Sequence, residues 1–357
     1  MLIYGAGYLG LYFCDLLLAN GVCPVAFLDR NRTLYGSTWE GVKVLSPSAG
    51  VKEYCDELVV VAHMDYQCVY PVIKSELLSM GYRHVCHIYE YAAEDTQQNI
   101  FAQQRMLIRL KNCLSVEHCE QAHGIAENLA DEESRLVYMS IIDILARGLY
   151  TGRVSAHPLS EQYMAFDLYR PLQHEVIVDV GAGPKAEFMQ EALQENWQFK
   201  RYYYFEPAGN IRGASVRYAN DARVEFVDKA VGQACGKAYL RNYRDMNALL
   251  FRLPFNQSKN WLEVSIVSLD AYSFTDTPTF VKVDTEGWEK NVLCGGMTLL
   301  QHARPVLACA IYHYGSDFVE IPATLIAMLP NYSFYVRSYT NWSETIFYAV
   351  PDERRIQ

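Results

Sequence analysis

The stretch VKVDTEGWEKNVLCGG, Val281 to Gly296, constrains the fold more than any other part of the chain. A run of β-forming residues leads into two carboxylates, Asp284 and Glu286, and the next apolar residues recur at helical spacing: Trp288, Val292 and Leu293. The pattern predicts a strand, a tight turn and a helix. Ligands of an open α/β sheet bind beyond the carboxyl ends of its strands, so both carboxylates are predicted to lie at the rim of a site. Acids at such a turn also cap a helix and stabilise its dipole, which is the alternative role.

The chain opens with a second pattern of this kind. The segment LIYGAGYLG reads as a short strand followed by GxGxxG, with Gly5, Gly7 and Gly10, and a second strand ends at Asp29 about twenty residues later. This spacing is typical of a dinucleotide fold, in which glycines let a phosphate approach a helix N-terminus and the acid reaches ribose hydroxyls. Two further apolar strands complete a compact Rossmann-like unit over residues 1–94. It resembles the nucleotide-binding-like module at the N-terminus of sugar-modifying bacterial enzymes, which implies NAD(P) or a nucleotide sugar as ligand. A unit that binds nothing and serves assembly fits the same pattern.

A helical pattern over residues 95–160 predicts a connector, and strand patterns return over residues 161–357. The strand at 175–180 contains Asp179 and runs into Gly181, Ala182 and Gly183, where the backbone can come close to a ligand. The following strands of this region end at or near polar residues: Glu206, Asp228, Asp284 and His313. Two β-rich runs at 331–339 and 344–350 predict a terminal hairpin. A mostly parallel sheet that ends in an antiparallel hairpin is the order expected of a class I methyltransferase, a Rossmann-like α/β fold.

Five segments of this region resemble, in order and spacing, the FkbM family of S-adenosylmethionine-dependent O-methyltransferases. They are EVIVDVGAG, YYYFEP, VSLDAY, VKVDTEGWE and IYHYGSDFVEIP. The resemblance covers roughly residues 160–350, and its most specific part is the DxEGxE turn followed by YH…D…EIP. It implies methyl transfer from S-adenosylmethionine to a hydroxyl, such as that of a sugar in a polysaccharide or of a secondary metabolite. The acceptor is accordingly expected to be a small molecule or a glycan.

The resemblance also implies the cofactor residues. An acid at the end of the second strand, here Glu206, binds both ribose hydroxyls, because two carboxylate oxygens can accept both protons. Asp228 is placed to meet the adenine amino group, with a loop acid in a turn as the alternative. The remaining members of the implied site are Asp179, Gly181, Ala182, Gly183 and Asp284. The chain departs from the family pattern at Lys185, where the family usually has a further glycine.

Transfer of a methyl group to an alcohol needs in-line approach of the oxygen and a place for its proton. His313 is the first candidate for the general base, because the unperturbed pKa of histidine lies near neutrality. Asp284 or Glu286 could orient it or take the proton directly. A buried histidine bonded to a backbone carbonyl is the alternative for His313.

Composition excludes several classes of protein. A net charge of −10 argues against a partner that is a nucleic acid, since such a partner requires a basic face. The ten cysteines are scattered without a CxxC pair, which predicts neither disulfides nor a metal site and fits a reducing compartment. No apolar run is long enough to span a membrane and no secretory leader is evident, so a cytoplasmic protein is expected. Methyltransferases of this size often form homodimers, although no residue indicates one here.

Two other functions fit parts of the sequence. The first is a nicotinamide-dependent sugar oxidoreductase built on the N-terminal unit. Its weakness is that the YxxxK formed by Tyr70 and Lys74 lies too early in the chain, which indicates a chance match. The second is a non-catalytic nucleotide-binding scaffold, and Lys185 in place of glycine is the feature that favours it.

Overall fold

The structure is a computed structural model that describes residues 1–63, 69–88, 90–91, 114–147, 154–207, 216–218, 220–242, 248–251, 261–340 and 344–356. The chain forms two compact units. Unit 1 comprises Met1–Lys111, Arg241–Leu249 and Leu253–Trp261, and unit 2 comprises Asn112–Leu240, Leu250–Arg252 and Leu262–Gln357. The sequence predicted contiguous domains with boundaries at residues 94 and 160. Unit 1 instead also contains two segments from the middle of the sequence. Residues 95–113 and 148–153 of the predicted connector lie outside the described residues.

Unit 1 contains a six-stranded sheet in the order β3-β4-β2-β1-β5-β6. Its strands are β1 (Leu2–Tyr4), β2 (Ala26–Leu28), β3 (Thr38–Trp39), β4 (Val42–Leu45), β5 (Leu58–Val61) and β6 (His84–His87). All neighbours pair in parallel except β3 and β4. The helices are α1 (Tyr8–Ala19), α2 (Pro47–Tyr54) and α3 (Val69–Met80). These parallel strands are short apolar runs buried in the unit, as their sequences predict.

An ion pair inside unit 1 joins residues that are far apart in the chain. Asp15 lies on α1 and is fully buried, and its carboxylate accepts hydrogen bonds from Arg241 Nε at 2.8 Å and Nη2 at 3.0 Å. Arg241 Nη2 also bonds Glu40 at 2.7 Å, and its guanidinium lies 4.8 Å from the ring centre of Trp39. Local sequence patterns could not predict this pairing, because 226 residues separate its two partners.

Unit 2 contains a seven-stranded sheet in the order β16-β17-β15-β14-β7-β8-β9. Its strands are β7 (Glu175–Val180), β8 (Phe199–Phe205), β9 (Val224–Val227), β14 (Phe280–Val283), β15 (Val306–Ala310), β16 (Tyr332–Ser338) and β17 (Thr345–Pro351). All are parallel except β17, which is antiparallel to both of its neighbours. The predicted α/β class, with a mostly parallel sheet that ends in an antiparallel hairpin, is confirmed. Residues 341–343 of the predicted hairpin turn lie outside the described residues.

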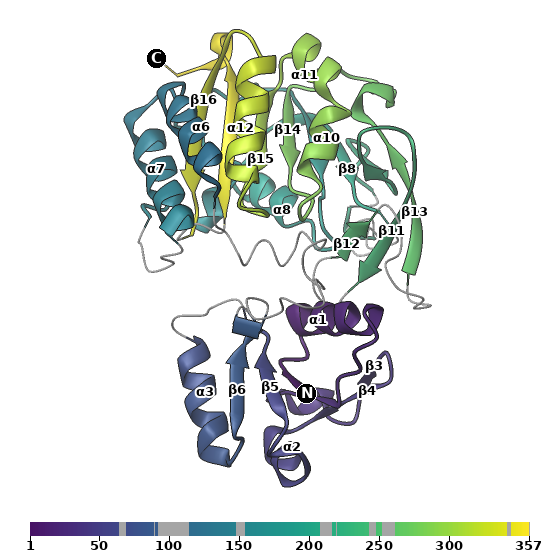
Figure 1. Ribbon diagram of the computed structural model, residues 1–357. Coiled ribbons are helices and arrows are strands. Elements are labelled where there is room, and N and C mark those ends of the chain that lie inside the picture. The colour runs from purple at the N-terminus through teal and green to yellow at the C-terminus, as the bar shows by residue number, and fades with distance from the viewer. Residues whose placement is uncertain are drawn as a thin grey trace. The chain divides into compact units, whose positions relative to one another are not determined.

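Two layers cover this sheet because successive side chains of a strand point to opposite faces. On β14, Val281 and Val283 enter an aliphatic core together with apolar residues of five helices. These helices are α6 (Val116–Glu127), α7 (Glu132–Arg147), α10 (Glu289–Cys294), α11 (Met297–Ala303) and α12 (Asp317–Met328), and Figure 1 shows them along one side of the sheet. Phe280 points to the other face, where α8 (Glu187–Gln194) and an aromatic cluster pack.

A second, four-stranded sheet has the order β10-β13-β11-β12. Its strands are β10 (Ala230–Val231), β11 (Gly236–Asn242), β12 (Ala248–Phe251) and β13 (Trp261–Val267). The sequence patterns did not predict a second sheet. Among the described residues, no helix has the length and hydropathy needed to cross a bilayer.

We expect Arg241→Met to lower the free energy of unfolding of unit 1 by roughly 3 to 5 kcal/mol, because it leaves the buried Asp15 carboxylate without its main counter-charge. Lys237→Met is the matched control, since Lys237 lies on the same strand and pairs with Glu263 at the surface. Urea unfolding of both variants measures the difference. Equal stabilities would show that the buried pair contributes no more than the exposed one.

Candidate functional site

The carboxyl ends of four neighbouring strands bring the predicted residues of unit 2 to one edge of the sheet. β14 lies between β7 and β15, and β8 lies on the far side of β7. The strands that precede Asp284 and His313 are neighbours, with Val283 beside Cys309 in the register. This edge is where an α/β sheet binds its ligands.

The glycine loop after β7 contacts the turn after β14 directly. Gly181 has a φ of +74°, and a Cβ at this position would lie 1.9 Å from the carbonyl oxygen of Asp284. Only glycine permits this approach. Two residues on, the N–H of Gly183 donates to Glu206 Oε2 at 3.0 Å, so Glu206, which follows β8 and is mostly buried, is held against the loop. The hydroxyl of Tyr204 also donates to the Gly183 carbonyl.

Asp179 lies beneath this loop and is fully buried. Its carboxylate accepts a hydrogen bond from the Tyr202 hydroxyl at 2.6 Å and pairs with Lys282 Nζ at 2.9 Å. Lys282 also donates to the carbonyl of Gly181 at 2.7 Å. Burial lowers the pKa of Lys282, but the carboxylates of Asp179 and Asp284 outweigh this effect, and the pKa is raised overall. Asp179 thus supports the loop, and Lys282, which sequence reasoning did not select, is part of the same support.

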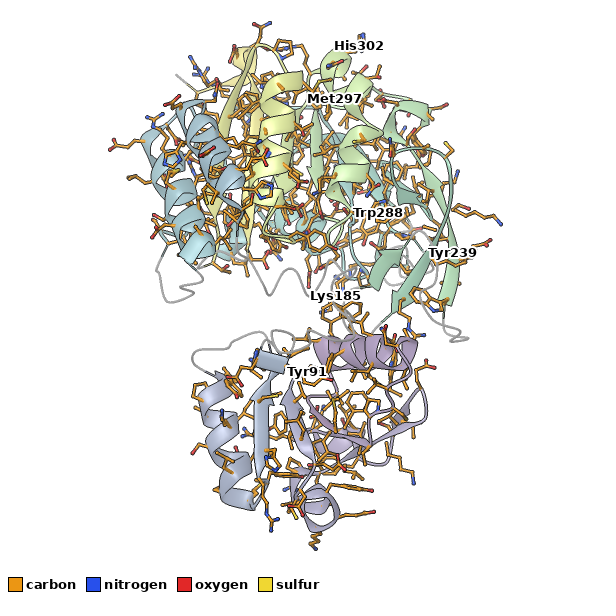
Figure 2. All side chains as sticks on the ribbon, viewed as in Figure 1. Tyr91, Lys185, Tyr239, Trp288, Met297 and His302 are labelled. Atoms are coloured by element: carbon orange, nitrogen blue, oxygen red, sulfur yellow. The ribbon has the colours of Figure 1, made fainter. Side chains whose placement is uncertain are left out.

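Two other predicted features lie at the surface. Asp228 follows β9 and is exposed. The side chain of Lys185 is 75% exposed, and its ammonium lies 3.7 Å from Glu187 (Figure 2). The residue after it, Ala186, takes the left-handed φ of +56° at the start of α8 and is buried. Lys185 therefore points to solvent and does not fill the glycine loop.

His313 lies among three carboxylates at the ends of β14 and β15. Its Nε2 is 3.4 Å from Asp284 Oδ1 and 3.5 Å from Glu286 Oε2, and its Nδ1 is 2.9 Å from Glu289 Oε1. His313 is 2% exposed, whereas Asp284 and Glu286 are 20% and 23% exposed. The structure brings the three predicted catalytic residues together, with the two acids nearer to solvent than the histidine.

Glu289 is the residue of this cluster that sequence reasoning missed, although the DxEGxE motif contains it. It is buried at the start of α10, and its Oε1 accepts hydrogen bonds from the backbone N–H of Thr285 at 2.7 Å and of Gly287 at 3.2 Å. Burial opposes the charge on Glu289, but His313 and the Thr285 N–H stabilise it and lower its pKa to about 2. An ionised Glu289 fixes the orientation of the imidazole ring.

Asp284 is held from the opposite side by a tyrosine outside the predicted motifs. The Tyr163 hydroxyl donates to Asp284 Oδ2 at 2.6 Å, and the ring of Tyr163 lies 5.3 Å from Lys282 Nζ. Burial and the neighbouring Asp284 carboxylate raise the pKa of Tyr163 well above its usual value, so its hydroxyl stays a donor. The Tyr312 hydroxyl lies 3.5 Å from the same carboxylate oxygen.

Asp284, Glu289 and His313 each offer one ligand atom within 4.8 Å of one another, a spacing at which a metal ion could be held. The two carboxylates, however, face different nitrogens of the ring: Glu289 lies at Nδ1 and Asp284 at Nε2. A single ion bound to one nitrogen would not lie between both carboxylates. The contacts of the two nitrogens of His313 with Asp284 and Glu289 hold the ring in this position.

In unit 1, the structure places Gly5 and Gly7 between β1 and α1, and Gly10 within the first turns of α1. Asp29 follows β2, and its carboxylate accepts hydrogen bonds from the N–H of Ala6 and of Asn31, both at 2.7 Å. Asp29 is therefore bonded to the glycine loop itself. Tyr70 and Lys74 lie on α3. The Tyr70 hydroxyl donates to Glu90, so this pair has a structural explanation.

Residues 179–336 match the family model of the methyltransferase FkbM domain. The crystal structure of a methyltransferase FkbM from Methylobacillus flagellatus KT aligns with a TM-score of 0.63 at 18% identity, over 98% of this chain and 89% of that one, and this likeness shows the fold. No curated protein matches the sequence.

Two other solved structures align with TM-scores too low to carry an argument. UDP-D-quinovosamine 4-dehydrogenase from Vibrio fischeri is 28% identical over 24% of this chain and 75% of its own, with a TM-score of 0.22. Precorrin-6y C5,15-methyltransferase from Geobacter metallireducens GS-15 is 12% identical over 50% of this chain and 82% of its own, with a TM-score of 0.26.

We expect Glu289→Gln to weaken the dependence of stability on acid pH. Because the pKa of Glu289 is lowered from 4.5 to about 2, its ionisation stabilises the folded state above pH 4.5, and this contribution is lost as the pH falls towards 2. The free energy of unfolding, measured by urea denaturation at several pH values, should fall less steeply in the variant over this window.

Glu263→Gln is the control, since Glu263 lies at the surface, where it pairs with Lys237 and accepts a hydrogen bond from the Tyr239 hydroxyl. Asp317 must be followed as well, because burial and the Glu289 carboxylate raise its pKa to about 6 and its ionisation lowers stability as the pH rises. If the free energy of unfolding of Glu289→Gln falls as steeply towards acid pH as that of the wild type, the lowered pKa of Glu289 is contradicted.

Proposed function

We propose that the protein transfers a methyl group from S-adenosylmethionine to a hydroxyl group of a small molecule or glycan, because residues 179–336 match the family model of the methyltransferase FkbM domain. The proposed acceptor is a sugar in a polysaccharide or a secondary metabolite. The observation that carries the proposal is the joint edge of β7, β8, β14 and β15. There a glycine loop with its acid, Glu206, adjoins a second group of acids around His313.

Glu206 is the residue that would bind the ribose of the cofactor. Its Oε2 accepts the N–H of Gly183, which fixes the carboxylate beside the loop, and a carboxylate suits a vicinal diol because it can accept two hydrogen bonds. Gly181, Ala182 and Gly183 would present backbone to the cofactor, with Asp228 near the adenine. Asp179 would act through the loop, since it is bonded to Tyr202 and Lys282.

When bound, S-adenosylmethionine supplies a methyl group activated by a sulfonium. The acceptor hydroxyl would lose its proton as its oxygen takes this methyl group from the sulfur, and residues of the chain would receive that proton. We assign contact with the hydroxyl to Asp284 and Glu286, because they are more exposed than His313. His313 lies behind them and can take up or share the proton, and Glu289 and Tyr163 orient His313 and Asp284. Most of the rate acceleration would come from positioning.

The exposed position of Lys185 supports a working cofactor loop over the scaffold function, which depended on that residue. For unit 1 we propose a separate ligand, a nucleotide such as NAD(P) or a nucleotide sugar. An oxidoreductase gains no support from Tyr70 and Lys74, because the Tyr70 hydroxyl is bonded to Glu90. A homodimer and a cytoplasmic location stay predictions.

We expect Glu206→Ala to weaken binding of S-adenosylmethionine roughly 10- to 100-fold, since hydrogen bonds to a charged group contribute about 1.5 to 3 kcal/mol. Isothermal titration calorimetry of the full chain measures the affinity, and Glu195→Ala, an exposed acid at the end of α8, is the control. Equal affinities for the two variants would remove Glu206 from the cofactor site.

We expect Glu286→Gln and Asp284→Asn to lower the methyl-transfer rate by roughly 10²-fold or more, and Glu286→Gln to leave the affinity for S-adenosylmethionine within a few-fold of the wild type. The physical reason is that an amide cannot accept the acceptor's proton. Formation of S-adenosylhomocysteine with a panel of neutral glycans measures the rate. Full activity in both variants would leave His313 as the base.

A further inference from the structure

An open cavity of about 420 Å³ lies in unit 1 and takes no part in the proposed methyl transfer. Residues at the ends of three strands line this cavity. They are Tyr4 at the end of β1, Asp29 and Arg30 after β2, and His63 after β5. β2 and β5 lie on opposite sides of β1, so the cavity lies beyond the carboxyl ends of the strands where the strand order reverses. In an open α/β sheet this switch point is the usual place for a ligand.

The glycine loop beside the cavity is fixed by Asp29, whose two carboxylate oxygens each accept a backbone N–H, from Ala6 and from Asn31. Asp29 was expected to bind a ribose. Its carboxylate already holds the backbone of the glycine loop. Helix α1 begins immediately after the loop, with Gly7 as its N-cap, no capping side chain and no acid in its first turn. The positive end of the helix dipole is thus not neutralised by an acid of the first turn.

Gly7 differs from the other two glycines of the motif. A Cβ at Gly10 would lie 1.8 Å from the Gly5 carbonyl oxygen, and Gly5 has a φ of +102°, so packing and backbone conformation account for both. Gly7 has a φ of −87°, and a Cβ there would meet nothing within 4 Å. The fold itself does not require glycine at this position. Close approach of a ligand to the backbone would require it.

The opposite wall of the cavity is apolar. Helix α3 contributes Val69 and Val72, and Val72 is 62% exposed although it is a large aliphatic side chain. Arg30 supplies a cation on the β2 side of the same cavity, where it pairs with Glu76 of α3. An apolar wall, an aromatic side chain at Tyr4 and a basic group near a helix N-terminus together suit a flat base joined to phosphates.

We propose that this cavity binds the nucleoside diphosphate part of a nucleotide, with the base against Tyr4 and Val72 and the phosphates beside Gly7. The inference refines the nucleotide ligand proposed for unit 1 and does not depend on methyl transfer. A nucleotide sugar and a dinucleotide both carry this chemical group. The lining residues recognise the part that the two ligands share.

The test is calorimetric titration of the full chain with UDP, ADP, UDP-N-acetylglucosamine and NAD⁺. We expect at least one to bind, and Val72→Glu to weaken that binding at least tenfold, because a carboxylate replaces the apolar surface against which the base would lie. Leu78→Glu is the matched control, since Leu78 is an exposed aliphatic residue on the same helix that is absent from the cavity lining. Gly7→Val is a second variant, and it should also weaken binding without loss of the folded state.

The outcomes distinguish a nucleotide sugar from a dinucleotide, and they distinguish the nucleotide site of unit 1 from the methyl-transfer site of unit 2. Binding of UDP and the nucleotide sugar supports the proposal with a nucleotide sugar as the source, and binding of ADP and NAD⁺ supports it with a dinucleotide. If none of the four binds at about 1 mM, or if Val72→Glu and Gly7→Val bind as tightly as Leu78→Glu, the proposal is wrong. Titration of the same proteins with S-adenosylmethionine reports on unit 2 independently, so failure of one proposal is distinguishable from failure of the other.

Discussion

The buried ammonium of Lys282 holds together the two parts of the candidate methyl-transfer site. It pairs with Asp179, donates to the carbonyl of Gly181, and lies over the ring of Tyr163, whose hydroxyl binds Asp284. Removing a charge from water is costly, and a buried ion pair is stable only when its remaining hydrogen bonds are made. Here those bonds run to Asp179 and to the glycine loop, and the ammonium also lies over the Tyr163 ring. The energetic cost of burial is thus offset by groups that also fix the shape of the site.

The second feature of the site is an excess of carboxylates around one imidazole. Asp284, Glu286 and Glu289 surround His313, and they differ in burial and hydrogen bonding. Glu289 is held ionised by backbone N–H groups and the ring, while Asp284 and Glu286 stay partly open to solvent. Because their environments differ, Glu289 can orient the imidazole ring, whereas Asp284 and Glu286 are open to an acceptor.

Local pattern, together with the family resemblance, was sufficient to predict the mostly parallel seven-stranded sheet, its terminal hairpin and the edge where the site residues meet. It failed where two partners are distant in the chain. Tyr163 binds Asp284 across 121 residues, and Lys282 meets Asp179 because β14 and β7 are neighbours in register. A strand pattern shows which residues are buried, but not which side chain will lie opposite. Glu289 could have been found, because the predicted helix places it one turn from the acids of the motif.

The pairing of Asp15 with Arg241 has a consequence for how the protein is made. Ribosomes release the N-terminus first, and α1 emerges long before residue 241 is synthesised. Until then the Asp15 carboxylate lacks the guanidinium that accompanies it in the completed interior, and burying it alone would be unfavourable. Unit 1 should therefore reach its final packing late in translation, despite containing the first residues of the chain. Nascent chains that end before residue 241 should expose this helix to chaperones and proteases.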